Sequence, residues 1–103
     1  MKDIETVSNT IEEKIDKAEK EIKCALYFRE KRPQLAEAYY KAANDELEHV
    51  KLFHTQVVAI IDEYNKSGKE TPDSMKILYE ILHRKHIEHM AAVKGMIALY
   101  KEQ

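Results

Sequence analysis

Residues 33–68 read PQLAEAYYKAANDELEHVKLFHTQVVAIIDEYNKSG, a stretch that runs from a proline to a glycine with no other residue of either kind between them. Proline is favoured at the first position of a helix and glycine just beyond its end. The stretch therefore predicts one long helix over 33–66, with Gly68 as the residue that ends it.

Two stretches of similar length flank this helix, at 3–31 and 72–102, and each predicts a further helix. Thr71-Pro72-Asp73 is a typical helix start, with a capping hydroxyl, a proline and an acidic first turn. Apolar residues recur at steps of three and four along all three stretches, and short connections make neighbouring helices antiparallel. We expect an all-α fold, with three long antiparallel helices in a single domain over 1–103.

Composition excludes several classes of protein. The chain has 103 residues, 44% of them hydrophobic and 35% charged, and its two glycines and two prolines are too few for a turn-rich β fold. The net charge of −2, with both signs interspersed, lacks the basic surface of a protein that binds nucleic acid or an anionic membrane. There is no apolar run of membrane-spanning length, no signal-peptide core and one cysteine, Cys24. We expect a soluble cytoplasmic protein without an internal disulfide.

A second set of apolar residues lies beside the main stripes of the second and third stretches. Three helices would not easily cover both sets, which favours a homo-oligomer, a dimer or larger. The alternative is a wider core with a few exposed apolar side chains. The set consists of Leu47, Val58, Ile61, Ile77, Met90 and Ala91.

Two polar residues, Glu46 and His49, interrupt the apolar stripe of the second stretch between Ala42 and Val50. A glutamate is rarely buried without a partner, and no lysine or arginine occupies this stripe. Glu-x-x-His places an oxygen and a nitrogen one helical turn apart, the spacing by which one helix gives two ligands to a metal. A metal ion is therefore a candidate partner.

The third stretch has its own polar interruption, His86-x-x-His89, between Leu82 and Val93. Counting outward from the loops places these histidines, Glu46 and His49 at one depth, together with Glu21 or Glu19 of the first stretch. This predicts a metal site shared by three helices. A solvated histidine face is the alternative reading, and it suits His54 and His83 best. Two further acids, Glu80 of the Glu80-x-x-His83 pair and Glu88, remain open as additional ligands.

The segment AEAYYKAANDELEHVKLFH and the preceding EKEIKCALYFREKRPQL resemble the ferritin-like superfamily, in particular rubrerythrin-type proteins, over roughly residues 15–64. The resemblance implies that Glu21, Glu46 and His49 are ligands of a di-iron or di-manganese centre. The third stretch departs from the family pattern, because it has His86 and His89 where members usually have glutamates and a second Glu-x-x-His. There is no fourth helix, so the bundle would be completed by oligomerisation, as in short encapsulin-associated members.

Two functions follow. The first is a ferritin-like metal-binding protein with iron, or else manganese or zinc, used in iron oxidation and storage or in O₂ and peroxide chemistry. Such a protein would be a ferroxidase or a peroxide-reducing oxidoreductase, although the sequence leaves catalytic turnover open. The second is a non-catalytic module that associates with itself or a partner, in which the acids and histidines form a buried polar network that sets the register of the helices.

Overall fold

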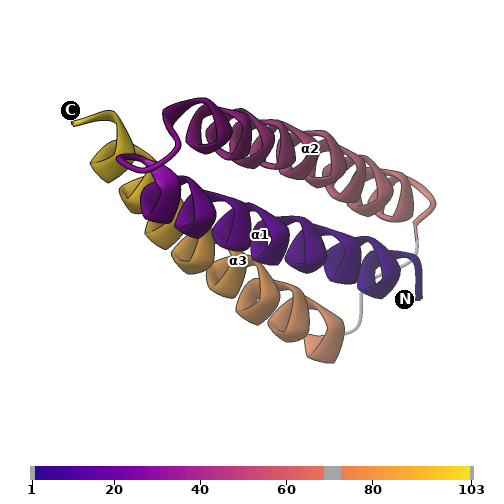
Figure 1. Cartoon of the computed structure of the whole chain (residues 1–103). Helices are drawn as coiled ribbons and strands as arrows, with labels where there is room; N and C mark the ends of the chain where they lie inside the picture. The colour runs from indigo at the N-terminus through magenta and orange to yellow at the C-terminus, as the bar shows by residue number, and fades with distance from the viewer. Residues whose placement is uncertain (1, 69–72, 103) are drawn as a thin grey trace.

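The computed structural model describes residues 2–68 and 73–102, and these form three α-helices: α1 (Lys2–Phe28), α2 (Pro33–Lys66) and α3 (Asp73–Lys101). No strand occurs in the described ranges, which confirms the predicted all-α class. Figure 1 shows α1 running between the other two helices, antiparallel to α2. None of the described helices is apolar enough over a sufficient length to cross a membrane.

The helix ends follow local chemistry. α1 stops at Phe28, three residues earlier than expected, and the N–H of Arg32 bonds to the carbonyl oxygen of Phe28 at 2.8 Å to close the turn. Pro33 then opens α2, where its missing N–H has no cost. Gly68 follows the last turn of α2 with a φ of 77°, the left-handed conformation predicted for the residue that ends this helix. The predicted helix start at Thr71-Pro72 lies outside the described residues.

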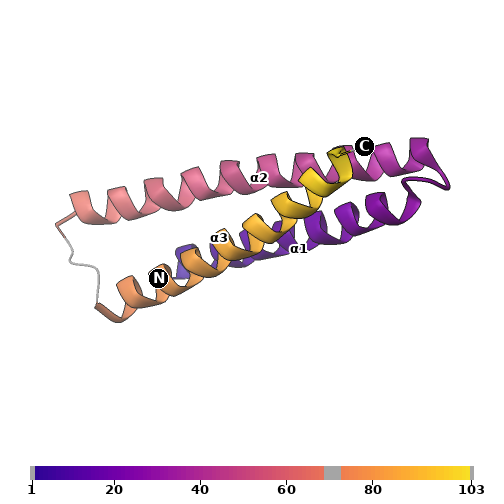
Figure 2. The ribbon, with the colours of Figure 1, turned by 90° about the vertical axis from the view of Figure 1, so that its left-hand side faces the viewer.

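The core is built around α1, whose apolar stripe is buried along the whole helix. Ile15, Ala18, Ile22 and Ala25 of this stripe are completely buried. α1 packs against both other helices, whereas α2 and α3 make few contacts with each other. Figure 2 shows the consequence: α2 and α3 approach at the C-terminal end of α3 and separate toward their connection. α2 and α3 thus enclose α1 on two sides, and a groove lined by residues of all three helices lies between them.

In the first half of α2, the buried face differs from the predicted apolar stripe through Ala42, which is only half-buried. Ala36, Ala43 and Leu47 are buried, whereas Leu35 is exposed. The small alanines let α2 approach α1 closely near the turn, and this rotates Leu47 from the second apolar set into the core. Of that set, Val58, Ile77 and Ala91 remain exposed. Self-association therefore stays a prediction, carried by fewer residues than the sequence indicated.

Candidate metal centre

α1 carries two groups of charged residues on opposite faces. At about 100° per residue, Glu12, Asp16 and Glu19 share one face of the helix. Glu21 follows Glu12 by nine residues and therefore points to the opposite side. Because α2 and α3 pack on different sides of α1, each group of charges meets the polar residues of a different helix.

The first group meets α3. We call Glu12, Asp16, Glu19, His86 and His89 the α1–α3 cluster. Nδ1 of His89 lies 3.2 Å from Oε1 of Glu12 and 3.8 Å from Oδ1 of Asp16, and its Nε2 lies 2.8 Å from Oε1 of Glu19. The second oxygen of Glu12 lies 3.2 Å from Nε2 of His86. One ligand atom each from Glu12, Asp16 and His89 falls within 4.8 Å of the others, a spacing that allows one metal ion to bind all three.

The two histidines of this cluster have opposite electrostatic environments. Burial disfavours the charged form of His89, but its hydrogen bonds with Glu19 and Glu12 outweigh burial and raise its pKa above the ordinary value. For His86, burial dominates over the attraction of Glu12 and lowers the pKa. Hydrogen bonds from Lys23 and then His89 lower the pKa of Glu19. The raised pKa favours the protonated form of His89, and a metal ion that binds this ring competes with the proton.

The second group meets α2. We call Lys14, Lys17, Glu21, Glu46 and His49 the α1–α2 cluster. The side chain of Glu46 is 9% exposed, and its oxygens lie 3.5 Å from Nζ of Lys14 and 3.5 Å from Nζ of Lys17. Nδ1 of His49 lies 3.6 Å from Oε2 of Glu46. The two lysines thus supply from α1 the positive charge that the stripe of α2 lacks.

The carboxylates of this second cluster differ in ionisation. Burial favours the neutral form of Glu46, but Lys14 and Lys17 outweigh it and lower its pKa. Burial and then the charge of Glu46 raise the pKa of Glu21. Among the described residues, the buried Oε1 of Glu21 and Oε2 of Glu46 accept no hydrogen bond. With two ammonium groups beside its central carboxylate, the α1–α2 cluster does not fit a divalent cation in this arrangement.

The structure divides the predicted ligands between the two clusters. Glu21, Glu46 and His49 come together at α2, and His86 and His89 come together at α3, on the other side of α1. Counting through the loops compares depth along the bundle but not direction around α1. Glu19 belongs to the α3 side and Glu21 to the α2 side, so the two are not alternatives for one position.

Two acids of the α1–α3 cluster, Glu12 and Asp16, were missed by the sequence analysis. Their spacing with Glu19, at steps of four and three, was a signal for one helical face. This face lies beside the apolar stripe and has the composition of an ordinary solvated surface, so the sequence alone does not distinguish it as a site. Among the described residues, Glu80 and Glu88 are exposed and form no ion pair with either cluster.

Comparison with known proteins identifies no family for this chain. No protein-family model matches the chain, and neither a curated protein nor a solved structure matches it significantly. The two clusters therefore have to be interpreted from their own chemistry.

Proposed function

We propose that this chain is a helical metal-binding protein that holds a first-row transition metal in the α1–α3 cluster. The observation that carries the proposal is the convergence of Glu12, Asp16 and His89, with their ligand atoms within 4.8 Å of one another. Two carboxylates and one imidazole form a mixed oxygen and nitrogen donor set, which suits iron, manganese or zinc. Glu19 and His86 lie at hydrogen-bond distance from these ligands and would orient them.

Access to solvent favours a reactive site over a sealed structural one. The side chains of Asp16 and Glu12 are 55% and 39% exposed, and the side chain of His89 is 20% exposed. Three protein ligands at a partly open site leave coordination positions for water, O₂ or peroxide. An open site of this kind is compatible with iron oxidation and storage or with peroxide chemistry, and the metal we propose is iron, with manganese or zinc as the alternatives.

A ferritin-like assembly belongs to the same proposal. Glu21 lies beside the Glu46-x-x-His49 pair, but Lys14 and Lys17 neutralise Glu46, so the likeness concerns the arrangement of the helices and not this set of ligands. Exposed apolar side chains of α2 and α3, among them Val58 and Ile77, offer a surface on which a second copy would pack. A dimer of this kind would complete a four-helix arrangement that one chain lacks.

The second candidate is a module in which both clusters are structural networks. It is favoured by the pairing within the α1–α3 cluster, where both ring nitrogens of His89 already contact carboxylates. A protonated His89 would hold α3 on α1 without any metal. The two functions make different predictions for metal binding.

The test is metal content after purification without chelator, followed by titration with Fe²⁺ under anaerobic conditions and with Mn²⁺ and Zn²⁺. The double variant Glu12→Gln/Asp16→Asn should weaken binding at least about tenfold, because it removes both anionic ligands. Glu13→Gln is the matched control, since Glu13 is an exposed neighbour on α1. Absence of stoichiometric metal binding in the wild type and the control would favour the structural network, and unchanged affinity in the double variant would place the ion at another site. Loss of metal in Glu46→Ala/His49→Ala, with the double variant unaffected, would locate the site at α2.

A further inference from the structure

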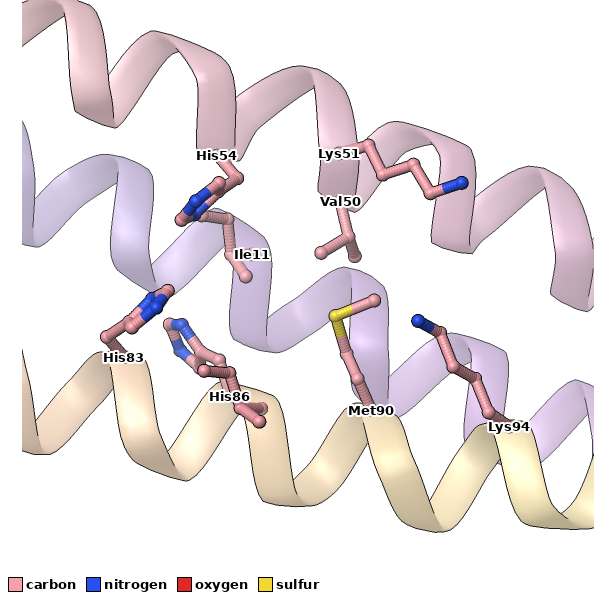
Figure 3. A pocket seen from close by; sticks show the side chains of 9 residues that line it. Ile11, Val50, Lys51, His54, His83, His86, Met90 and Lys94 are labelled. Carbon is pink, nitrogen blue, oxygen red and sulfur yellow. The ribbon is translucent and has the colours of Figure 1, made fainter.

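The groove between α2 and α3 contains three histidines from two helices. It is a cavity of about 200 Å³ whose floor and walls are mainly apolar, with Ile11, Val50 and Met90 among its lining residues. His54 of α2 and His83 and His86 of α3 line the same cavity. Figure 3 shows their three rings gathered at one end of the groove, with His54 facing the two histidines of α3.

The rings are in direct contact across the groove. The centroids of His54 and His83 are 5.1 Å apart, and the planes are within 20° of parallel. Tyr79 also stacks with His83, with 5.7 Å between the ring centroids. Nε2 of His86 lies 3.2 Å from Oε2 of Glu12, so this ring is oriented. This is one of the few places where α2 and α3 meet.

We propose that His54, His83 and His86 form a second metal site, rich in imidazole, that binds an ion of the Zn²⁺ and Cu²⁺ class and ties α2 to α3. Neutral imidazole is a preferred ligand of these ions, in contrast to the carboxylate-rich α1–α3 cluster. Stacked rings present their faces, so binding requires His54 and His83 to turn their nitrogen edges toward the ion. The χ2 torsion of histidine is broad, and the open groove leaves room for this rotation.

The charges around the groove are compatible with a cation at this end. Lys51 and Lys94 also line the cavity, but Figure 3 shows both at the end away from the imidazole rings. Glu12 contacts His86 and provides a compensating negative charge. A metal ion here would add a strong link between two helices that otherwise make few contacts, so binding and closure of the groove should be coupled.

The experiment is a Zn²⁺ titration by calorimetry of four proteins: wild type, His54→Asn/His83→Asn, Asp16→Asn/His89→Asn and the control Glu13→Gln. Glu13 is exposed on α1 and does not line the groove. Wild type and control should bind two equivalents of Zn²⁺ per chain. The groove variant should lose one equivalent, and Asp16→Asn/His89→Asn should lose the other while the groove site persists.

A spectroscopic measurement covers the case in which the groove variant does not fold. Cu²⁺ bound to Asp16→Asn/His89→Asn should give an electron paramagnetic resonance spectrum with hyperfine splitting from at least two imidazole nitrogens. A spectrum without nitrogen splitting would overturn the groove site. Unchanged Zn²⁺ stoichiometry in a folded groove variant would do the same. The groove site could be correct while the proposed α1–α3 site is wrong. In that case Asp16→Asn/His89→Asn would bind as much Zn²⁺ as the wild type, and the groove variant would bind none.

Discussion

Glu19 and Glu21 are two residues apart on α1, yet they face different helices. Oε1 of Glu19 lies 2.8 Å from Nε2 of His89 on α3, whereas Glu21 lies beside Glu46 of α2. Two residues turn the helix by about 200°, so neighbouring acids serve opposite interfaces. Their pKa values are displaced in opposite directions, down for Glu19 and up for Glu21. The two interfaces therefore respond differently to substitution and to pH.

Glu21→Gln should stabilise the metal-free protein at pH 7. The pKa of Glu21 is raised by burial and by the charge of Glu46, so its ionised form is less favourable in the folded state than in the unfolded chain. Removing the charge should increase the free energy of unfolding by up to about 1 kcal/mol. Urea denaturation measures this, with the exposed Glu13→Gln as the control. A less stable Glu21→Gln protein would show that Glu21 is stabilised by an interaction other than those described.

Glu46 should contribute stability at neutral pH that disappears in acid. Its pKa is lowered in the folded state, because Lys14 and Lys17 outweigh the effect of burial. The contribution is present above the unfolded-state pKa of about 4.3 and is lost as the pH falls through the lower folded-state value. The melting temperature should fall more steeply between pH 7 and pH 3 for wild type than for Glu46→Gln. Parallel curves would contradict the ion pairs at Glu46.

His89 should behave in the opposite sense when no metal is present. Its pKa is raised, because hydrogen bonds with Glu19 and Glu12 exceed the penalty of burial. Its contribution is fully present below the unfolded-state pKa of about 6.5 and is lost as the pH rises through the folded-state value. His89→Asn should therefore cost about 1–2 kcal/mol at pH 5.5 and less at pH 9. Denaturation with chelator present measures this, and a cost independent of pH would contradict a charged His89.

Metal binding at the same cluster should strengthen as the pH rises, because the ion competes with the proton on His89. At pH 8, saturating metal should raise the melting temperature, and the increase should become smaller toward pH 5.5. Added chelator should reverse it. A melting temperature indifferent to iron, manganese and zinc at pH 8 would favour the structural module instead.

The remaining exposed apolar residues should support self-association. Ile77 and Ile81 are 58% and 56% exposed and lie one helical turn apart on α3. We expect a dimer or larger species at micromolar concentration, and Ile77→Lys/Ile81→Lys should shift it toward monomer. Sedimentation equilibrium measures the mass. A 12.1 kDa species alone for wild type, with and without metal, would contradict this prediction.

Sequence periodicity predicted the core of α1 better than that of α2. The stripe of α1 is buried along its length because this helix packs on both neighbours, so its apolar face has no freedom to rotate. α2 packs on α1 alone over most of its length. In its first half the buried face lies one residue beyond the predicted stripe, at Ala36, Ala43 and Leu47. Apolar steps of three and four leave such a rotation undetermined, since adjacent stripes of one helix have similar composition.

The sequence by itself determined the break at Pro33 and the helix end at Gly68, because both depend on local backbone chemistry. It also determined the all-α class and the presence of acids and histidines near the core, because these depend on the 3.6-residue period. Only the tertiary structure decided which acids meet which histidines. Partners across an interface depend on the direction that each helix faces, and loop counting contains no such angle. For this reason Glu12 and Asp16, rather than Glu46, lie beside His89, and Lys14 and Lys17 lie beside Glu46.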